Sequence, residues 1–254
     1  MPDDLFDISG KVAVVTGGSS GIGAMIARGY VEAGVRTYIA SRKADQLQAV
    51  ADELGDGCIP LQADLATEAG CKALADQVAE REAQLHILVN NAGATWGVPL
   101  AEHDEAAWTR VLNLNVQGVF HTTKFLLPLL QAAGTADDPA RVINIGSING
   151  LRPPELETYS YSSSKAAVHQ LSAHLAQKLA PTVTVNAVAP GPFESKMMKA
   201  TLDAFGEMIA ATSPMKRIGR PDDMVGITRF LASRGASYIT GACIPVDGGA
   251  TNTR

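Results

Sequence analysis

The stretch that decides the fold is VAVVTGGSSGIG, at residues 12–23. Its first five residues are a short run rich in valine, which predicts a fully buried strand. A glycine cluster follows, and apolar residues then recur at helical spacing, which predicts a helix over 22–33. Glycines between a strand and a helix let backbone N–H groups approach a pyrophosphate at the positive end of the helix dipole. A dinucleotide site is therefore favoured over an ordinary turn, although the spacing of Gly17, Gly21 and Gly23 differs from G-x-G-x-x-G.

Strand and helix patterns alternate along all 254 residues. The predicted strands span 11–16, 35–40, 58–63, 86–90, 141–146, 183–187 and 243–246. The predicted helices span 22–33, 43–54, 67–83, 104–132, 158–179 and 222–233. Several strands are apolar throughout, as expected when helices cover both faces of a parallel sheet. The predicted fold class is α/β, a single-domain Rossmann fold over residues 1–254 with a doubly wound parallel seven-stranded sheet and helices on both faces.

The overall composition argues against several kinds of function. The net charge of -5 argues against nucleic acid or an anionic membrane surface as the main partner. The start of the chain shows no secretory pattern, and no run approaches about 18 apolar residues, so we expect no membrane and a cytoplasmic location. The 3 cysteines and 5 histidines are scattered without the spacing of metal ligands, so no metal site is expected.

A second informative run is YSYSSSK, at residues 159–165. Residues four apart share a helix face, so Tyr161 faces Lys165, whereas Tyr159 does not. We expect the ammonium to favour the phenolate and to lower the pKa of Tyr161 toward the working pH. That would suit a general acid/base for an alcohol–carbonyl interconversion. The alternative is a buried tyrosine beside a lysine that only packs.

Polar and small residues follow several of the predicted strands, at the edge of the sheet where ligands bind in such folds. They are Asp64 and Leu65, Asn90 to Gly93, Ser147, and Pro190 with Gly191. A long segment of weak periodicity follows at about 190–216, and segments of this length in compact domains often close over a site. We therefore expect a substrate loop there.

With these residues in place, the chain resembles the short-chain dehydrogenase/reductase family over essentially its full length. The resemblance rests on the glycine run at 16–23, Asp64, the Asn-Asn-Ala-Gly run at 90–93, Asn115, Ser147, the pair Tyr161 and Lys165, and Pro190 with Gly191, in the family's order. The chain looks most like 3-oxoacyl-thioester reductases and rhamnolipid-pathway-type ketoreductases, because of the segments at 140–147, 162–167, 214–221 and 245–249.

The resemblance implies a catalytic tetrad of Asn115, Ser147, Tyr161 and Lys165. Tyr161 would give its proton to the substrate carbonyl oxygen, and Ser147 would hold that oxygen. Lys165 would lower the pKa of Tyr161 and bind the nicotinamide ribose, and Asn115 would fix a water that relays protons through Lys165. From the residues alone, a solvated helix position for Asn115 and a turn or cap for Ser147 are the alternatives.

The resemblance also implies the cofactor contacts, which are Gly17, Ser19, Ser20, Gly21, Ile22, Gly23, Ser41, Arg42, Asp64, Leu65, Asn91, Ala92, Gly93, Tyr161, Lys165, Pro190 and Gly191. Asp64 would bond the adenine edge, with a place near a helix N-cap as its alternative. An NAD enzyme carries an acid after its second strand, where this chain has Ser41 and Arg42. A hydroxyl and a guanidinium suit a 2′-phosphate, so NADP(H) is favoured over NAD(H). The alternative for Arg42 is the solvated start of a helix.

On the substrate side, the expected lining residues are Trp96, Ser147, Asn149, Tyr161 and Phe193, with Ile148, Leu151, Pro192, Met197 and Met198 nearby. This mainly apolar lining suits an acyl chain or a hydrophobic ketone. The predicted function is NADPH-dependent reduction of a ketone to a secondary alcohol, above all of a 3-oxoacyl thioester carried by acyl carrier protein or CoA.

Two other functions stay open at this point. One is an NAD(P)-dependent dehydrogenase that oxidises a polyol, a sugar acid or a secondary alcohol. The other is a non-enzymatic dinucleotide-binding sensor, against which the complete tetrad argues. The resemblance also implies two kinds of partner, an acyl carrier protein and further copies of this chain in a homotetramer.

Overall fold

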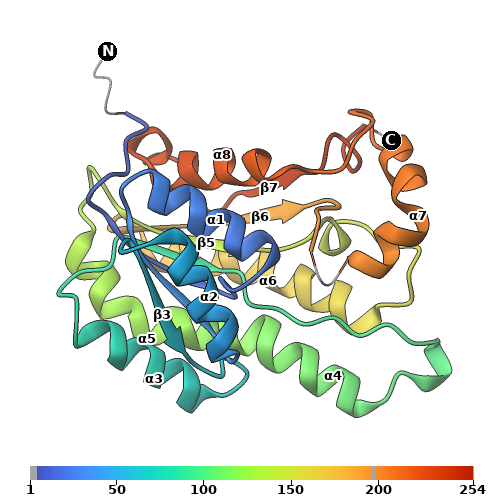
Figure 1. The fold of residues 1–254 in the computed structure, drawn as a ribbon, viewed down its shortest axis with the longest axis horizontal. Coiled ribbons are helices and arrows are strands. Elements are labelled where there is room, and N and C mark those ends of the chain that lie inside the picture. Colours follow the sequence, from blue (N-terminus) through green and yellow to red (C-terminus); the bar gives the residue numbers. More distant parts are fainter. Residues whose placement is uncertain (1–4, 196–197, 254) are drawn as a thin grey trace.

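The computed structural model describes residues 5–195 and 198–253, and within them one sheet of seven strands forms the centre (Figure 1). The strands are β1 (Val12–Thr16), β2 (Arg36–Ser41), β3 (Cys58–Gln62), β4 (Ile87–Asn90), β5 (Ala140–Ile145), β6 (Val183–Pro190) and β7 (Cys243–Val246). Their order across the sheet is β3-β2-β1-β4-β5-β6-β7, and every adjacent pair is parallel. The predicted doubly wound sheet is confirmed, and its strand order changes direction between β1 and β4, where dinucleotides bind in such folds.

Helices cover both faces of this sheet. They are α1 (Gly21–Glu32), α2 (Ala44–Leu54), α3 (Glu68–Ala79), α4 (Glu105–Leu112), α5 (Gly118–Ala133), α6 (Tyr159–Leu179), α7 (Lys199–Thr212) and α8 (Pro221–Ala232). Hydrophobic packing joins α1, α2 and α8 to one face, and α3, α5 and α6 to the other. Figure 1 shows the two layers above and below the strands, with α7 standing apart from both. No helix in the described ranges is both long and apolar enough to cross a membrane.

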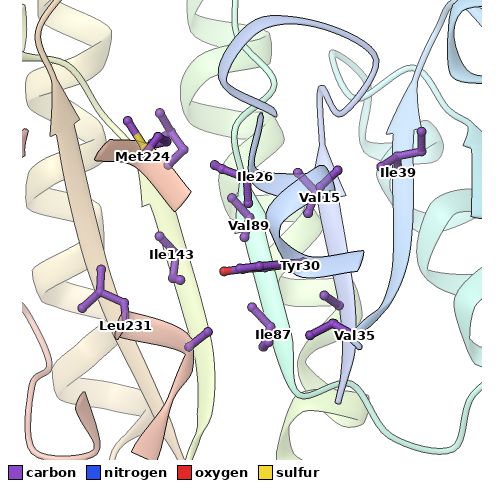
Figure 2. Close-up of a cluster of buried hydrophobic side chains, with 14 of the residues drawn as sticks. Val15, Ile26, Tyr30, Val35, Ile39, Ile87, Val89, Ile143, Met224 and Leu231 are labelled. Atoms are coloured by element: carbon purple, nitrogen blue, oxygen red, sulfur yellow. The ribbon is translucent and has the colours of Figure 1, made fainter. Parts of the chain in front are cut away.

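The strands alternate between two apolar cores, which explains why their sequences are apolar throughout. On β1, Val15 packs into the core below α1 and α8, whereas Val14 packs into the core of the opposite face. Figure 2 shows the first core, where Tyr30 of α1 lies among Ile87, Val89 and other strand residues. Burying one such side chain fully stabilises the fold by about 1.5–3 kcal/mol. These contacts hold the carboxyl ends of the central strands in fixed positions.

Side-chain caps define where two of the helices begin. The Oγ1 of Thr67 accepts a hydrogen bond from the backbone N–H of Gly70 at 3.0 Å, at the start of α3. The Oδ1 of Asp104 accepts one from the N–H of Ala107 at 2.9 Å, at the start of α4. Each cap satisfies a backbone donor that has no partner within its helix.

Two predicted segments differ from the structure. The helix predicted over 104–132 is interrupted by a π-helical turn at Asn113–Gln117, which separates α4 from α5. Such a turn inserts one residue into the helical ladder without disturbing the apolar periodicity strongly, so the sequence pattern does not reveal it. The segment predicted to be irregular, 190–216, contains helix α7, which the Pro-Gly-Pro run at 190–192 before it concealed.

Candidate active site and cofactor cleft

A cleft of about 450 Å³ opens at the carboxyl ends of β1, β4, β5 and β6. It is bordered by the glycine turn after β1, the loop after β4, the turn after β5, the start of α6 and the segment after β6. Most of the predicted site residues line it, namely Gly17, Ser19, Ser20, Gly21, Ile22, Asn91, Ala92, Gly93, Ser147, Asn149, Tyr161, Lys165, Pro190, Gly191 and Phe193. The structure therefore brings the predicted catalytic side and the predicted cofactor side into one space.

The turn after β1 allows a ligand to approach its backbone closely. Gly17 and Gly21 have φ angles of 67° and 54°, which side chains disfavour. A Cβ on Gly23 would overlap the carbonyl oxygen of Gly17 and the side-chain amide of Asn91. Ser20 stands at the N-cap of α1 without capping it, so the first N–H groups of α1 are left for a ligand. Residues of this kind fit the pyrophosphate of a dinucleotide.

Asn91 ties the loop after β4 to this turn. Its Nδ2 donates to the carbonyl oxygens of Thr16 at 2.9 Å and Gly17 at 3.3 Å. The backbone N–H groups of Asn91 and Ala92 both donate to the Oγ1 of Thr16, at 2.9 and 3.0 Å. The side chain of Asn91 therefore holds the floor of the cleft in shape.

The ends of β2 and β3 lie beside the cleft and carry the residues predicted for the adenosine end. Arg42 is 64% exposed, and its Nε lies 4.0 Å from Oδ1 of Asp64. The Oγ of Ser41 accepts a hydrogen bond from the backbone N–H of Lys43 at 3.2 Å. Arg42 is thus free to turn toward an added phosphate, whereas the side chain of Leu65 is buried in the core and offers only backbone atoms.

Tyr161 and Lys165 share the cleft, as predicted from their spacing, but their electrostatics differ from the prediction. Lys165 is buried, and its Nζ donates a hydrogen bond to the carbonyl oxygen of Ile145 at 2.7 Å. Burial lowers the pKa of Lys165 to about 8. Burial also raises the pKa of Tyr161, and a hydrogen bond with the hydroxyl of Ser147 opposes this shift only in part.

The predicted lowering of the pKa of Tyr161 by Lys165 is therefore wrong for this structure. The Nζ of Lys165 lies 5.7 Å from the centre of the Tyr161 ring, where it faces the carbonyl of Ile145. Removing the phenol from water disfavours its charged form, and this effect outweighs the help of a neighbouring donor. At neutral pH Tyr161 thus carries its proton, which is the form that a proton donor needs.

Ser147 begins the short turn that follows β5. Its Oγ accepts a hydrogen bond from the backbone N–H of Asn149 at 3.1 Å, so it caps the turn and also faces Tyr161. The turn or cap role considered from the sequence is thus confirmed, and the same hydroxyl lies where the catalytic role would need it. Behind it, the backbone N–H of Ser147 points at Nε2 of His169 at 3.5 Å, and burial lowers the pKa of His169. A neutral His169 can accept this hydrogen bond.

Asn115 is fully buried in the π-helical turn, and both ends of its side chain are used. Its Oδ1 accepts from the N–H of Ala94 at 2.8 Å, and its Nδ2 donates to the carbonyl of Ala94 and to the Oγ of Ser164, both at 2.9 Å. A Cβ on Gly93 would lie 3.3 Å from Oδ1 of Asn115 and 3.7 Å from Nζ of Lys165. Asn115 and Lys165 therefore both lie next to Gly93, and Gly93 and Lys165 line the cleft.

The lining of the cleft differs from the prediction at several residues. Trp96 does not line the cleft, because its ring packs under the guanidinium of Arg110, 5.1 Å from the ring centre. Met197 lies outside the described residues, whereas Met198 lines the cleft. The lining residues that the sequence analysis missed are Thr95, Gly97, Ile145, Gly146, Leu156, Thr158, Ser195 and Thr201.

Ser195 is the most informative of these missed residues. A Cβ on Gly21 would lie 3.0 Å from the Cβ of Ser195, so the segment after β6 lies directly against the glycine turn. The Oγ of Ser195 accepts from the backbone N–H of Met198 at 3.2 Å. Its place four residues after Gly191, in a segment expected to cover the site, was the available signal. Among the described residues, no cluster of His, Cys, Asp and Glu could hold a metal ion.

The chain matches known proteins over nearly its whole length. A model of the short chain dehydrogenase family matches residues 11–204. The rhamnolipid biosynthesis 3-oxoacyl-[acyl-carrier-protein] reductase of Pseudomonas aeruginosa is 45% identical over 250 residues, 96% of this chain and 97% of the relative. The galactitol 2-dehydrogenase (L-tagatose-forming) of Cereibacter sphaeroides is 36% identical over 253 residues, 97% of each protein.

A solved structure adds a three-dimensional match. The Pseudomonas aeruginosa RhlG/NADP active-site complex superposes with a TM-score of 0.91 at 43% identity, covering 97% of this chain and 98% of that one. The alignment therefore includes the strands, the glycine turn and the segments that border the cleft.

Proposed function

The chain belongs to the short chain dehydrogenase family, and from this premise we propose that it reduces the ketone of a 3-oxoacyl thioester, or of a similar hydrophobic carbonyl compound, with NADPH. The observation that carries the proposal is the meeting of Tyr161, Ser147 and Lys165 in one cleft with the glycine turn. A proton donor, a carbonyl-oxygen holder and a dinucleotide cradle are the parts that ketone reduction requires.

The proton chemistry follows from the protonation states. The bound nicotinamide supplies the hydride. Tyr161, protonated at neutral pH because of burial, donates its proton to the carbonyl oxygen as that oxygen gains negative charge. The hydroxyl of Ser147 donates a second hydrogen bond to the same oxygen, and it is already aligned with Tyr161. In the reverse reaction Tyr161 takes the proton back.

Lys165, which lines the cleft, and the buried Asn115 support this step. With a pKa of about 8, Lys165 is mostly charged at neutral pH, so its ammonium can donate hydrogen bonds to a bound cofactor. The ammonium has three donors, and one is used by the carbonyl of Ile145, so two are left for a ribose hydroxyl and a water. We propose that Asn115 holds the backbone of the π-helical turn in the position where such a water binds. This water would return protons from solvent to Lys165.

NADP(H) is the cofactor that the residues fit. Ser41 ends β2 and Arg42 follows it, at the strand end that reads the adenosine ribose in this fold, and neither position carries an acid. A guanidinium binds a phosphate through paired, charge-assisted hydrogen bonds. The structural relative that binds NADP supports the same choice. We propose that Asp64, beside Arg42, contacts the adenine edge.

The substrate assignment draws on the lining and on the relatives. Phe193, Leu156, Ile148 and Met198 give one end of the cleft an apolar lining. The 45% identical relative is named for a 3-oxoacyl group on acyl carrier protein, which makes an acyl carrier protein or CoA the proposed partner. The relative that forms L-tagatose from galactitol keeps polyol oxidation as the second candidate.

We also propose that residues 1–254 act as one domain, with the segment at 190–216 contacting the substrate, in a cytoplasmic homotetramer. Edge strand β7 supports an assembly because its residues are only half-buried, and Tyr238 nearby is fully exposed. A cavity of about 290 Å³, lined in part by Met215 and Ile244, borders the same edge. A sheet edge that is only half-buried is suited to contact with a second copy.

The decisive experiment follows the near-ultraviolet absorbance of reduced nicotinamide with acetoacetyl-CoA as substrate, in parallel with NADPH and NADH. Rapid oxidation of NADPH, and slow oxidation of NADH, is the expected result. The matched reaction supplies galactitol with the two oxidised cofactors. Faster turnover of galactitol than of acetoacetyl-CoA would mean that the protein is a polyol dehydrogenase and not the proposed reductase. Cofactor binding without turnover of any carbonyl or alcohol would favour the sensor.

A further inference from the structure

His169 is a half-buried histidine that the proposed mechanism does not use. It lies on α6 four residues after Lys165, so the two side chains share one side of the helix. That side faces the turn at 146–150, which follows β5 and carries Ser147. The imidazole ring therefore lies directly behind the residue proposed to hold the carbonyl oxygen.

The turn can close around this ring because glycines stand at both of its ends. A Cβ on Gly146 would overlap Nε2 of His169, and a Cβ on Gly150 would lie 2.8 Å from Cε1 of the same ring. Glycine has no Cβ, so the backbone at these two positions can lie against the imidazole. The place of the turn is thus matched to the size and the place of His169.

A hydrogen bond also ties the ring to Ser147. The backbone N–H of Ser147 donates to Nε2 of His169 at 3.5 Å. A buried N–H that loses its acceptor costs about 1–3 kcal/mol, which would favour a shift of the turn. The Oγ of Ser147 accepts from the N–H of Asn149 at 3.1 Å and faces Tyr161. A shift of the turn would therefore move this hydroxyl relative to the proposed proton donor.

One protonation state of His169 fits this arrangement. Nε2 can accept from Ser147 only while it carries no proton, so the proton of the neutral ring must sit on Nδ1. Nδ1 is buried, and the described part of the chain offers it no hydrogen-bond partner of good geometry. A second proton, on Nε2, would set the ring N–H against the N–H of Ser147. The charged ring is therefore incompatible with the observed turn.

The surroundings of the ring favour the neutral form. Burial lowers the pKa of His169 from its ordinary value of 6.5, and the ammonium of Lys165 lowers it further, whereas the backbone of Gly150 opposes the shift only in part. Gly146 and Ser147, the other neighbours, present backbone groups and an uncharged hydroxyl. His169 is thus uncharged at neutral pH.

We propose that His169 is a positioning residue for the reduction: its neutral ring accepts the N–H of Ser147 and supports the turn at 146–150, so that the hydroxyl of Ser147 stays aligned with Tyr161. This inference rests on the proposed function and adds to it a residue that does not line the cleft. Protonation of His169 would break the hydrogen bond. Activity should therefore fall as the pH drops below 6.5.

Three variants separate the hydrogen bond from simple packing. His169→Gln can place an acceptor oxygen near the position of Nε2 and does not titrate, whereas His169→Leu fills the space without an acceptor. His174→Leu makes the matched change at an exposed histidine of the same helix.

The first measurement is steady-state kinetics with acetoacetyl-CoA and NADPH. We expect His169→Leu to lose about tenfold in kcat, less than the roughly 10² to 10³-fold that follows removal of an oxyanion donor, because Ser147 is displaced and not removed. The KM for NADPH should stay near the wild-type value, which also shows that the variant is folded. His169→Gln should recover most of the lost kcat, and His174→Leu should match the wild type.

The pH profile provides a readout that a packing role would not change. The ratio of the wild-type kcat to that of His169→Gln should be constant above pH 6.5 and should fall below it. The reason is that the wild type loses its acceptor when His169 binds a proton, whereas glutamine keeps its own. Other groups that titrate in this range cancel in the ratio.

Nitrogen NMR of isotope-labelled histidine tests the arrangement without any turnover. The signals that are absent from His169→Leu should show a proton on Nδ1 and none on Nε2 at neutral pH. A ring protonated at Nε2, a constant kcat ratio across the pH range, or equal losses in the glutamine and leucine variants would each overturn the inference and leave the proposed function intact. Inactivity of the wild type toward every carbonyl compound would overturn the proposed function itself, whatever the tautomer of His169.

Discussion

The side-chain amide of Asn115 donates a hydrogen bond to the Oγ of Ser164 at 2.9 Å, and the two residues are 49 positions apart in the chain. The same Oγ donates to the carbonyl oxygen of Tyr161 at 2.7 Å, within the first turns of α6. Both Asn115 and Ser164 are fully buried. One hydroxyl therefore connects the π-helical turn to the backbone that carries the proposed proton donor.

Replacing Ser164 by alanine should loosen this connection. The variant leaves a buried donor on Asn115 without a partner, which costs about 1–3 kcal/mol in the free energy of unfolding. We expect kcat to fall about tenfold, with the KM for NADPH nearly unchanged, because Tyr161 and not the glycine turn is displaced. Chemical denaturation and steady-state kinetics measure the two effects. Ser163→Ala, an exposed neighbour on the same helix, is the control and should match the wild type on both.

Tyr161→Phe tests the proposed proton donor directly. The change removes one hydroxyl and keeps the ring, so cofactor affinity measured by fluorescence titration should stay the same. Turnover should fall by about 10² to 10⁴-fold, the usual contribution of a general acid. Tyr159→Phe is the matched control, because the hydroxyl of Tyr159 donates to the carboxylate of Glu157 at 2.9 Å near the surface. Equal loss in both variants would contradict the assignment.

The elements of this fold could be predicted because their signals are local. The valine-rich run of β1 and the glycine turn after it need no knowledge of the rest of the chain, and the parallel sheet follows from the alternation of strands and helices. The π-helical turn around Asn115 was missed, because it depends on hydrogen bonds to Ala94. Helix α7 was missed as well, since the Pro-Gly-Pro run at 190–192 before it indicated a loop.

Most of the residues that form the site could be predicted from the sequence, whereas the direction of the pKa shift of Tyr161 could not. Spacing on a helix places Tyr161 and Lys165 on one face whatever surrounds them. The pKa of Tyr161 depends on burial by other segments, which spacing does not contain, so its direction was predicted wrongly. Trp96 was misplaced for a similar reason, because its partner Arg110 comes from α4 and draws the ring away from the cleft.

Arg42→Ala tests the choice of cofactor. The guanidinium is exposed at the end of β2, and a charge-assisted hydrogen bond to a phosphate contributes about 1.5–3 kcal/mol. We expect the KM for NADPH to rise about 10 to 100-fold, whereas the KM for NADH should hardly change. Arg28→Ala, which breaks only the ion pair with Glu53 on the surface, is the control. An equal rise for both cofactors would remove Arg42 from 2′-phosphate recognition.

The buried Lys165 should make stability depend on pH in a defined window. Its pKa is about 8 in the folded protein, against an ordinary value of 10.5. Between these values the unfolded chain binds a proton that the folded chain does not, so this residue's contribution to stability rises as the pH increases. Below pH 8 the folded protein instead holds a buried charge. The full effect over the window is at most about 3 kcal/mol.

Lys165→Met removes this dependence and keeps the apolar stem. We expect the free energy of unfolding of the wild type, relative to that of Lys165→Met, to increase from pH 8 to pH 10, measured by urea denaturation at each pH. Other groups that titrate in this range cancel in the difference between the two proteins. Lys178→Met, at an exposed lysine on the same helix, controls for removing a positive charge from α6. A difference that stays constant across the window would mean that burial does not lower the pKa of Lys165, and its proposed role as a buried ammonium beside Tyr161 would have to be abandoned.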